Sequence, residues 1–231
     1  MKNVPDLEEV LRRQDNSPLA APDAAAGAIR EAIVTGALRG GTTVRQDEVA
    51  RILGLSKAPV REALRELVAD GLVEPVKNRG FIVTEMSSSE MQEMFRIRES
   101  LECIAIELSM PFLAETDILS AEDALNKLED VEDTTWICRL NLDFHMALYR
   151  PSGAKQLLRM IRHAHYISHR YVHASFWLAG VSLGGQDEHR AILEACKRRS
   201  SARARELIRQ HVINAREDLS DKLKKYLNIV V

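Results

Sequence analysis

The sequence has few cysteines and no long apolar run. Its three cysteines, Cys103, Cys138 and Cys196, are odd in number and lack metal-site spacing, which argues against a disulfide framework or a zinc cluster. We expect buried, reduced thiols. No stretch approaches the roughly 18 apolar residues of a membrane span, and the first residues lack the apolar core of a signal peptide. The sequence therefore predicts a soluble, cytoplasmic protein with no membrane partner.

The chain also lacks a large net charge. Its 231 residues carry a formal charge of −2, and 45% of them are hydrophobic, which is enough for two packed domains. Residues 24–84 hold nine Lys and Arg against seven Asp and Glu, whereas the segments before and after are each net negative. Any positive field is therefore local and modest.

Two short helical patterns lie close together between Val44 and Gly80. The first spans Gln46–Leu53, and the second follows Ser56, whose hydroxyl is a suitable N-cap. The connection between them begins at Gly54 and is too short for anything but a sharp bend. Two helices joined in this way form a helix-turn-helix, whose second helix enters the major groove of DNA.

The second helix has three chemically distinct sides. Lys57, Arg61 and Arg65 follow one another in steps of four residues and form a basic side, and acidic residues lie further round. Gly71 is placed to end the helix in the left-handed conformation. The apolar side has the spacing of one buried helix face and consists of Val60, Ala63, Leu64, Leu67 and Val68.

A basic hairpin is predicted directly after this helix. Residues 72–76 and 81–84 read as strands around a tip that contains Lys77, Arg79 and Gly80. A hairpin after a helix-turn-helix is a wing, and its cations can reach phosphates or the minor groove. A small helical core with solvated charges would explain each part singly. Helix, turn, basic helix and basic wing in this order favour a DNA-binding domain.

The segment LGLSKAPVREALRELVADGLVEPVKNRGFIV resembles the winged helix-turn-helix of the GntR family of bacterial transcription regulators. It departs from the family pattern at Lys57 and Ala58, where Arg-Thr is usual, and loses a guanine-reading fork and a hydroxyl. The departure bears on which operator is read. Arg45 fits equally a phosphate contact and a solvated first-turn arginine. The predicted DNA-contacting residues are Arg45, Ser56, Lys57, Arg61, Arg65, Lys77, Arg79 and Gly80.

The rest of the chain is predicted to be a helical bundle, which makes the fold mainly α. Helical patterns cover residues 91–110, 121–128, 136–149, 154–179, 187–198 and 202–226 with short breaks between them. The predicted organisation is a flexible arm (1–22) that allows one helical turn around Leu7–Arg12, a winged helix-turn-helix (23–85), a linker (86–90) and a helical domain (91–231). We expect the helical domain to bind a metal and an effector and to form a homodimer.

Histidines suggest a metal site in this bundle. Asn141 and His145 share one helix face, and His189 and His211 lie at similar distances from the tight turn between the last two helices. At a rise of about 1.5 Å per residue, these two come level. Taken singly, each histidine is more simply a core or surface residue. Together, three imidazoles and an amide oxygen suit Zn²⁺, Ni²⁺ or another first-row divalent ion.

A second resemblance covers the same residues. The segments Asn141–Tyr149, Ser152-Gly153 and Glu188–Leu193 resemble the FCD ligand-binding domain of the FadR subfamily of GntR regulators, whose metal site uses Asp or Asn and three histidines. The resemblance implies metal ligands at Asn141, His145, His189 and His211. Because an Asn ligand leaves the metal charge uncompensated, we expect the effector to be a small organic acid bound to the metal.

Three further residues are predicted to contact the effector. Arg98 matches a family arginine that resembles a second carboxylate clamp, although a surface salt bridge with Glu102 explains it equally. His169 belongs to a stripe with His165 and His173 that fits a pocket wall, an alternative metal site or a polar face, and Tyr166 borders it.

The leading hypothesis is a ligand-controlled regulator, most simply a repressor, whose dimer reads a short palindromic operator. A metal-dependent hydrolase that uses the three histidines is the alternative. No carboxylate is placed with them in a pattern such as H-E-x-x-H, which argues against it. A DNA-bound architectural protein without a ligand is a third hypothesis.

Overall fold

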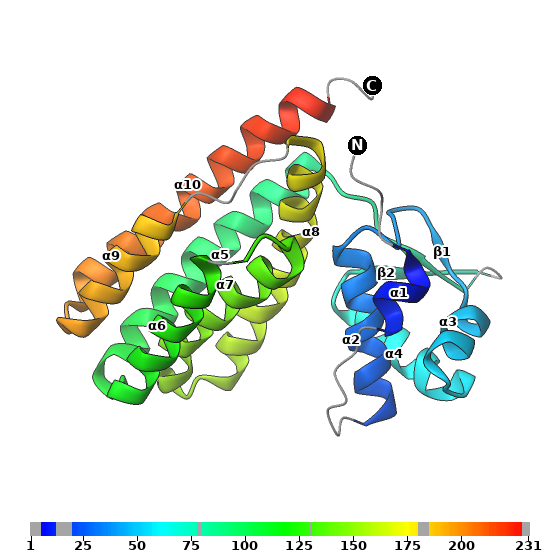
Figure 1. Cartoon of the computed structure of the whole chain (residues 1–231), viewed down its shortest axis with the longest axis horizontal. Coiled ribbons are helices and arrows are strands. Elements are labelled where there is room, and N and C mark those ends of the chain that lie inside the picture. Colours follow the sequence, from blue (N-terminus) through cyan, green and yellow to red (C-terminus); the bar gives the residue numbers. More distant parts are fainter. Residues whose placement is uncertain (1–5, 13–19, 78–79, 130, 180–184, 228–231) are drawn as a thin grey trace. The chain divides into compact units, whose positions relative to one another are not determined.

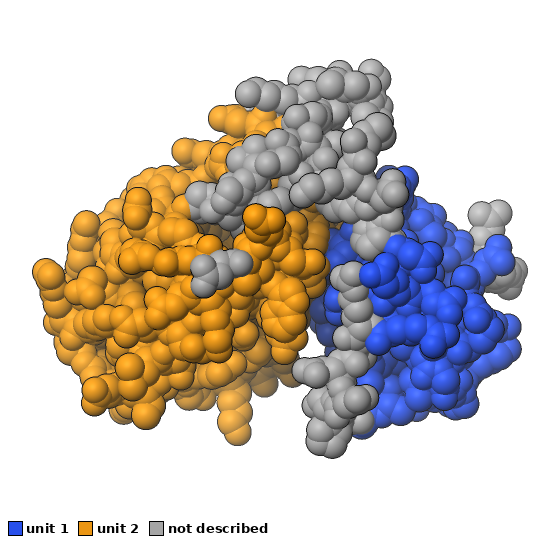
Figure 2. All heavy atoms as spheres, in the orientation of Figure 1, with its two compact units in different colours: residues 1–87 blue, residues 88–231 orange. Residues whose placement is uncertain are grey.

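The chain divides into two compact units, residues 1–87 and 88–231 (Figure 2). The structure is a computed structural model that describes residues 6–12, 20–77, 80–129, 131–179 and 185–227. Each unit has its own buried core. The first contains the predicted helix-turn-helix and the second contains the predicted bundle.

Four helices form most of the first unit (Figure 1): α1 (Leu7–Arg12), α2 (Ala21–Val34), α3 (Gln46–Leu53) and α4 (Lys57–Ala69). Ile29 of α2 and Leu64 of α4 are completely buried, so these two helices share a core. Val10 and Leu11 of α1 are also completely buried, so this part of the expected arm is a packed helix.

Left-handed glycines shape both ends of α4. Gly54 ends α3 with φ 65° and makes the sharp bend, while Gly71 follows α4 with φ 66°. The left-handed conformation of Gly71 was predicted, and Leu72 N donates to Leu67 O over 3.0 Å, which completes a Schellman motif. Ser56 occupies the N-cap position, but its side chain makes no capping hydrogen bond.

The wing belongs to a three-stranded antiparallel sheet with the order β1-β3-β2. Its strands are β1 (Thr43–Val44), β2 (Val73–Val76) and β3 (Gly80–Val83). Pro75 lies in an edge strand, where the missing N–H costs no ladder bond. The β2–β3 hairpin is the wing that the sequence predicts. β1 was not predicted, because two residues are too short to show an alternation.

The second unit is an all-α bundle (Figure 1). Its helices are α5 (Ser88–Ser109), α6 (Glu115–Glu129), α7 (Thr134–Tyr149), α8 (Lys155–Ala179), α9 (Gln186–Lys197) and α10 (Ser201–Leu227), with short 3-10 turns at Met110–Phe112 and Arg150–Ser152. The predicted fold class, a winged helix-turn-helix followed by a helical bundle, is confirmed.

The core of the bundle takes residues from all its helices, including Ile106, Phe144, Ile192 and Ile208. The three cysteines are buried and unbridged, as predicted. The main difference from the predicted helices is α6, which begins at Glu115, because the side chain of Asp117 accepts a 2.8 Å hydrogen bond from Ala114 N and starts the helix early. None of the described helices is long and apolar enough to cross a lipid bilayer.

Candidate functional site

The predicted basic side of α4 is exposed. Lys57, Arg61 and Arg65 all lie on the surface, whereas the apolar side of the same helix is buried in the first unit. A helix with one face packed and three cations on a free face can enter a major groove without unfolding anything.

An arginine of α2 forms salt bridges with the acidic side of α4. Arg30 donates to Glu66 over 3.0 Å and to Asp70 over 2.8 Å. The salt bridges neutralise carboxylates that would otherwise repel phosphates. α2 therefore both supports α4 and raises the local positive potential.

The other predicted DNA contacts surround α4. Arg45 precedes α3 and is exposed, as are Ser56, Lys77 and Gly80. Gly80 has φ 82°, a conformation that favours glycine at this end of the wing. Arg79 lies outside the described residues.

One cation of the basic side has a partner within the same unit. Lys57 Nζ lies 2.8 Å from Asp47 Oδ1 of α3, although both side chains are largely exposed. Asp47 was not singled out from the sequence. An exposed pair of this kind is weak, about 0–1 kcal/mol, so Lys57 can leave it for a phosphate.

In the second unit, three histidines meet in the bundle. His145 of α7, His189 of α9 and His211 of α10 each place a ring nitrogen within 4.8 Å of the others. The ring centroids of His189 and His211 are 4.5 Å apart, so these residues come level as their spacing predicts. All three side chains are buried.

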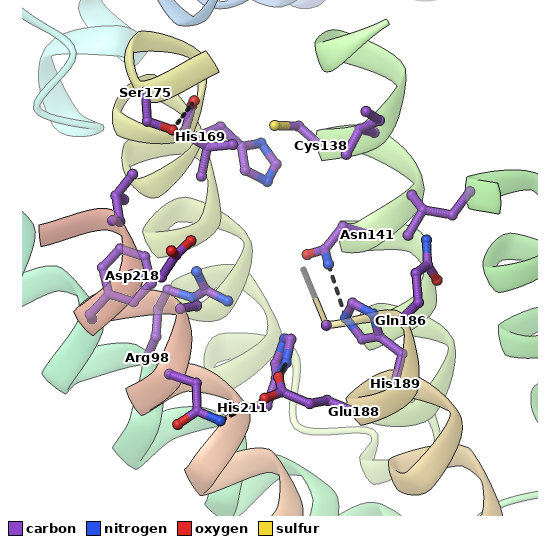
Figure 3. A pocket seen from close by; sticks show the side chains of 18 of the residues that line it. Arg98, Cys138, Asn141, His169, Ser175, Gln186, Glu188, His189, His211 and Asp218 are labelled. Atoms are coloured by element: carbon purple, nitrogen blue, oxygen red, sulfur yellow. Dashed lines mark hydrogen bonds and ion pairs between the residues drawn. The ribbon is translucent and has the colours of Figure 1, made fainter. Parts of the chain in front are cut away.

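Asn141 completes the predicted set. Its Nδ2 atom lies 3.1 Å from Nε2 of His189, and its side chain points toward that imidazole in Figure 3. Because amide oxygen and nitrogen are nearly equivalent in shape, the same side chain can present its oxygen there instead. The structure thus brings all four predicted ligands together.

In two of these histidines, the ring nitrogen Nδ1 contacts another side chain. His211 Nδ1 lies 2.7 Å from Glu188 Oε2, and His145 Nδ1 lies 3.2 Å from the hydroxyl of Tyr149. His145 Nε2 is buried with no hydrogen-bond partner among the described residues. Histidines held by Nδ1 with Nε2 bare have the arrangement of metal ligands, so the residues present fit a divalent ion.

Burial favours the neutral form of two of these histidines. It lowers the pKa of His145 and of His189 well below the usual value, and the neighbouring His211 lowers both further. Neutral imidazoles can bind a metal without first losing a proton.

A cavity of about 490 Å³ adjoins the cluster (Figure 3). Asn141, His189 and His211 line one part of it, and His169 lies at the opposite end. Arg98 also lines the cavity. It pairs with Glu102 over 2.8 Å, as one hypothesis proposed, but the pair is buried rather than on the surface.

Tyr166 is placed differently from the prediction. It packs against the hydrophobic core of the bundle and is not among the described residues that line the cavity. The prediction of an effector contact there is not supported by its position. One turn of helix separates it from His169, yet of the two only His169 lines the cavity.

Three neighbours of the histidine cluster were not predicted as site residues: Glu102, Tyr149 and Glu188. Glu188 carried a signal, since it directly precedes His189. Tyr149 lies four residues after His145, which puts both on one helix face. Glu102 carried no such signal, because it looks like the exposed partner of Arg98.

A basic helix with a wing in one unit and a metal-type cluster beside a cavity in the other define a DNA-binding protein with a helical accessory domain. Residues 22–83 match the model of the bacterial regulatory proteins, gntR family, and residues 93–214 match that of the FCD domain. Since the FCD match alone spans more than half of the chain, the protein belongs to the GntR-family transcriptional regulators with an FCD domain.

Relatives with known names agree. The chain is 29% identical to the HTH-type transcriptional repressor GlaR of Escherichia coli over 80% of this chain and 89% of that protein. It is 27% identical to the uncharacterized HTH-type transcriptional regulator YdhC of Bacillus subtilis over 85% and 90% of the two chains.

Solved structures show the same fold. A GntR family member from Pseudomonas syringae pv. tomato has a TM-score of 0.59 at 28% identity, covering 97% of this chain and 95% of that one. E. coli McbR/YncC has a TM-score of 0.78 at 23% identity, covering 90% and 99%. The protein is therefore a DNA-binding transcriptional regulator, and the alternative of a metal-dependent hydrolase is wrong, because the family and these relatives are regulators.

Proposed function

We propose that the protein is a cytoplasmic repressor whose affinity for its operator is controlled by a small organic acid bound to a divalent metal ion in the FCD domain. The metal ligands are His145, His189, His211 and Asn141. The observation that carries the proposal is the buried cluster of three histidines at the wall of a ligand-sized cavity. Zn²⁺ or Ni²⁺ is the preferred ion, since imidazole nitrogens suit both.

The charges of the cavity support an acid that depends on the metal. Among its described lining residues the only cation is Arg98, which already pairs with Glu102, while Glu129, Glu188 and Asp218 contribute carboxylates. In the metal-free protein an organic acid would meet a negative wall. A divalent ion held by neutral ligands supplies the positive charge that attracts a carboxylate.

In this proposal, a homodimer couples acid binding in the helical domain to operator binding by the winged domains. A homodimer formed through the helical domain presents two winged domains to the half-sites of a short palindrome. Ile104 and Leu108, one turn apart on α5, are 45% and 47% exposed, which is apolar surface that a second copy would cover. Acid binding changes the spacing of the winged domains and releases the operator.

A thermal-shift panel of organic acids, with and without added Zn²⁺ or Ni²⁺, tests the sensing half. We expect an acid that raises Tm only when metal is present, and loss of that shift in His189→Ala with the fold intact. His163→Ala, which removes a histidine outside the cluster and the cavity wall, is the control. Equal acid binding by metal-free protein would refute the metal-anchored site.

The regulatory half is tested on DNA. A duplex selected from the protein's own promoter region is labelled, and its binding is followed by fluorescence anisotropy. The acid found above should weaken binding of the wild type and leave binding by His189→Ala unchanged. Tighter binding in the presence of the acid would contradict repression relieved by the ligand.

A further inference from the structure

Glu102 of α5 is the only carboxylate among the described residues that is completely buried. It lies behind the histidine cluster, outside the proposed ligand set and outside the cavity wall. A buried charge of this kind is costly unless several groups stabilise it, so its partners indicate what it does.

Each oxygen of Glu102 has its own partners, from three different helices. Oε1 lies 2.8 Å from Nε of Arg98 on α5 and 3.1 Å from Nε2 of His165 on α8. Oε2 accepts a 2.9 Å hydrogen bond from the hydroxyl of Tyr149 on α7 and lies 3.7 Å from Nδ1 of His145 on the same helix. Burial alone would raise the pKa of Glu102, but Arg98 and His165 outweigh it and hold the pKa well below its usual value. Oε1 accepts from the guanidinium of Arg98, which can only donate, and Oε2 accepts from the hydroxyl of Tyr149.

The hydroxyl of Tyr149 determines the direction of the next hydrogen bond. A tyrosine hydroxyl has one hydrogen, and that of Tyr149 is donated to Glu102. Toward His145 Nδ1, 3.2 Å away, the hydroxyl can therefore only accept, so the proton of this imidazole must sit on Nδ1. The lone pair is then on Nε2, the buried atom that has no partner among the described residues.

We propose that Glu102 is a positioning residue of the metal site, which holds His145 through Tyr149 in the tautomer whose Nε2 can bind a metal. The same carboxylate accepts a hydrogen bond from Nε of Arg98. The two terminal nitrogens of that guanidinium are then available to a ligand in the cavity that Arg98 lines. One carboxylate thus prepares both the metal ligand and the cation of the site. A carboxylate behind a ligand histidine makes the imidazole a better donor to the metal.

This inference rests on the proposed metal site, so the experiment separates the two. Glu102→Gln would leave Arg98 without a charged partner in the core and can fail to fold, so the informative variant is Tyr149→Phe, which removes only the hydroxyl. The matched control is Tyr171→Phe. Tyr171 is equally buried and also donates to a carboxylate, that of Glu90, away from the cluster.

Two measurements are made on each full-length protein. Zinc affinity is determined by competition with a chromogenic chelator, and the His145 tautomer in metal-free protein is determined by long-range ¹H–¹⁵N NMR. We expect Tyr149→Phe to bind zinc about 10- to 100-fold more weakly and to show mixed tautomers. The Tyr171→Phe variant should match the wild type in both.

Wild-type zinc affinity together with a single His145 tautomer in Tyr149→Phe would overturn the inference. Equal weakening in both tyrosine variants would overturn it as well, because loosened packing would then be the cause. A wild type that binds no divalent ion would instead refute the proposed metal site. In that case the tautomer measurement still decides whether Tyr149 and Glu102 orient His145.

Discussion

Glu188 and His211 join α9 to α10 through a 2.7 Å hydrogen bond between a carboxylate oxygen and Nδ1 of the imidazole. The other carboxylate oxygen accepts from Asn214 over 2.6 Å. These bonds, that from His211 foremost, hold the pKa of Glu188 below its usual value. The arrangement leaves Nε2 of His211 for a metal, and it makes Glu188 the counterpart on α9 of what Glu102 is on α5.

Replacing this carboxylate should weaken metal binding. Glu188→Gln can keep only one of the two hydrogen bonds and loses the charge, so we expect about a tenfold lower zinc affinity in the chelator competition. Glu194→Gln, on the exposed side of the same helix, is the control. Unchanged affinity in Glu188→Gln would show that His211 is not oriented in this way.

The basic side of α4 should carry most of the operator recognition. Arg61→Ala or Arg65→Ala should each cost about 1–3 kcal/mol of binding free energy if the side chain reads a base, with relaxed sequence preference. A phosphate contact would instead lower affinity for all sequences and reduce the salt slope by about 1. Arg203→Ala, an exposed arginine on α10, serves as the control in the anisotropy assay. Full affinity in both α4 variants would exclude this face.

The Lys57–Asp47 pair predicts a gain of function. Asp47→Asn removes the carboxylate 2.8 Å from Lys57 and frees this cation for DNA. Because exposed pairs contribute about 0–1 kcal/mol, the affinity for random-sequence duplex should rise by no more than about fivefold. Anisotropy titrations at two salt concentrations measure the change, with Glu48→Gln on the same helix as the control. A fall in affinity would mean that Asp47 helps to position the recognition helix.

The buried His173 should make the protein sensitive to acid. Burial lowers its pKa to about 4, which Asp133 only partly offsets, against about 6.5 in an unfolded chain. Between these values the unfolded form binds more protons. This group therefore costs no stability above about pH 6.5 and up to about 3 kcal/mol as the pH falls to about 4.

Urea unfolding of the wild type and His173→Leu at several pH values checks this prediction. The variant should lose less stability than the wild type between about pH 6.5 and 4, and the two should differ least in their pH slope above that range. Parallel curves across the whole range would show that His173 is accessible to protons in the folded protein.

The helices of the winged helix-turn-helix could be predicted because their sequence signals are local. Gln46–Leu53 was predicted with the bounds that α3 has, since apolar spacing, a turn glycine and a helix start fall within a few residues. The meeting of His189 and His211 was also predictable. A tight turn and a constant rise per residue leave only one register for α9 and α10.

Other features depend on which face a helix turns inward. His169 lines the cavity whereas Tyr166, one turn away, packs in the core, and helical spacing alone cannot distinguish them. β1 exists only because β3 supplies hydrogen-bond partners for two residues that carry no pattern of their own.

Periodicity, turn residues and short connections specify the two domains, the basic recognition helix and the register of His189 with His211, because these signals act over a few residues. The packing of the bundle makes Glu102 a buried carboxylate with partners on three helices rather than the exposed half of a surface salt bridge. Its partners come from α7 and α8, far away along the chain, and the environment of a charge is set by what packs around it.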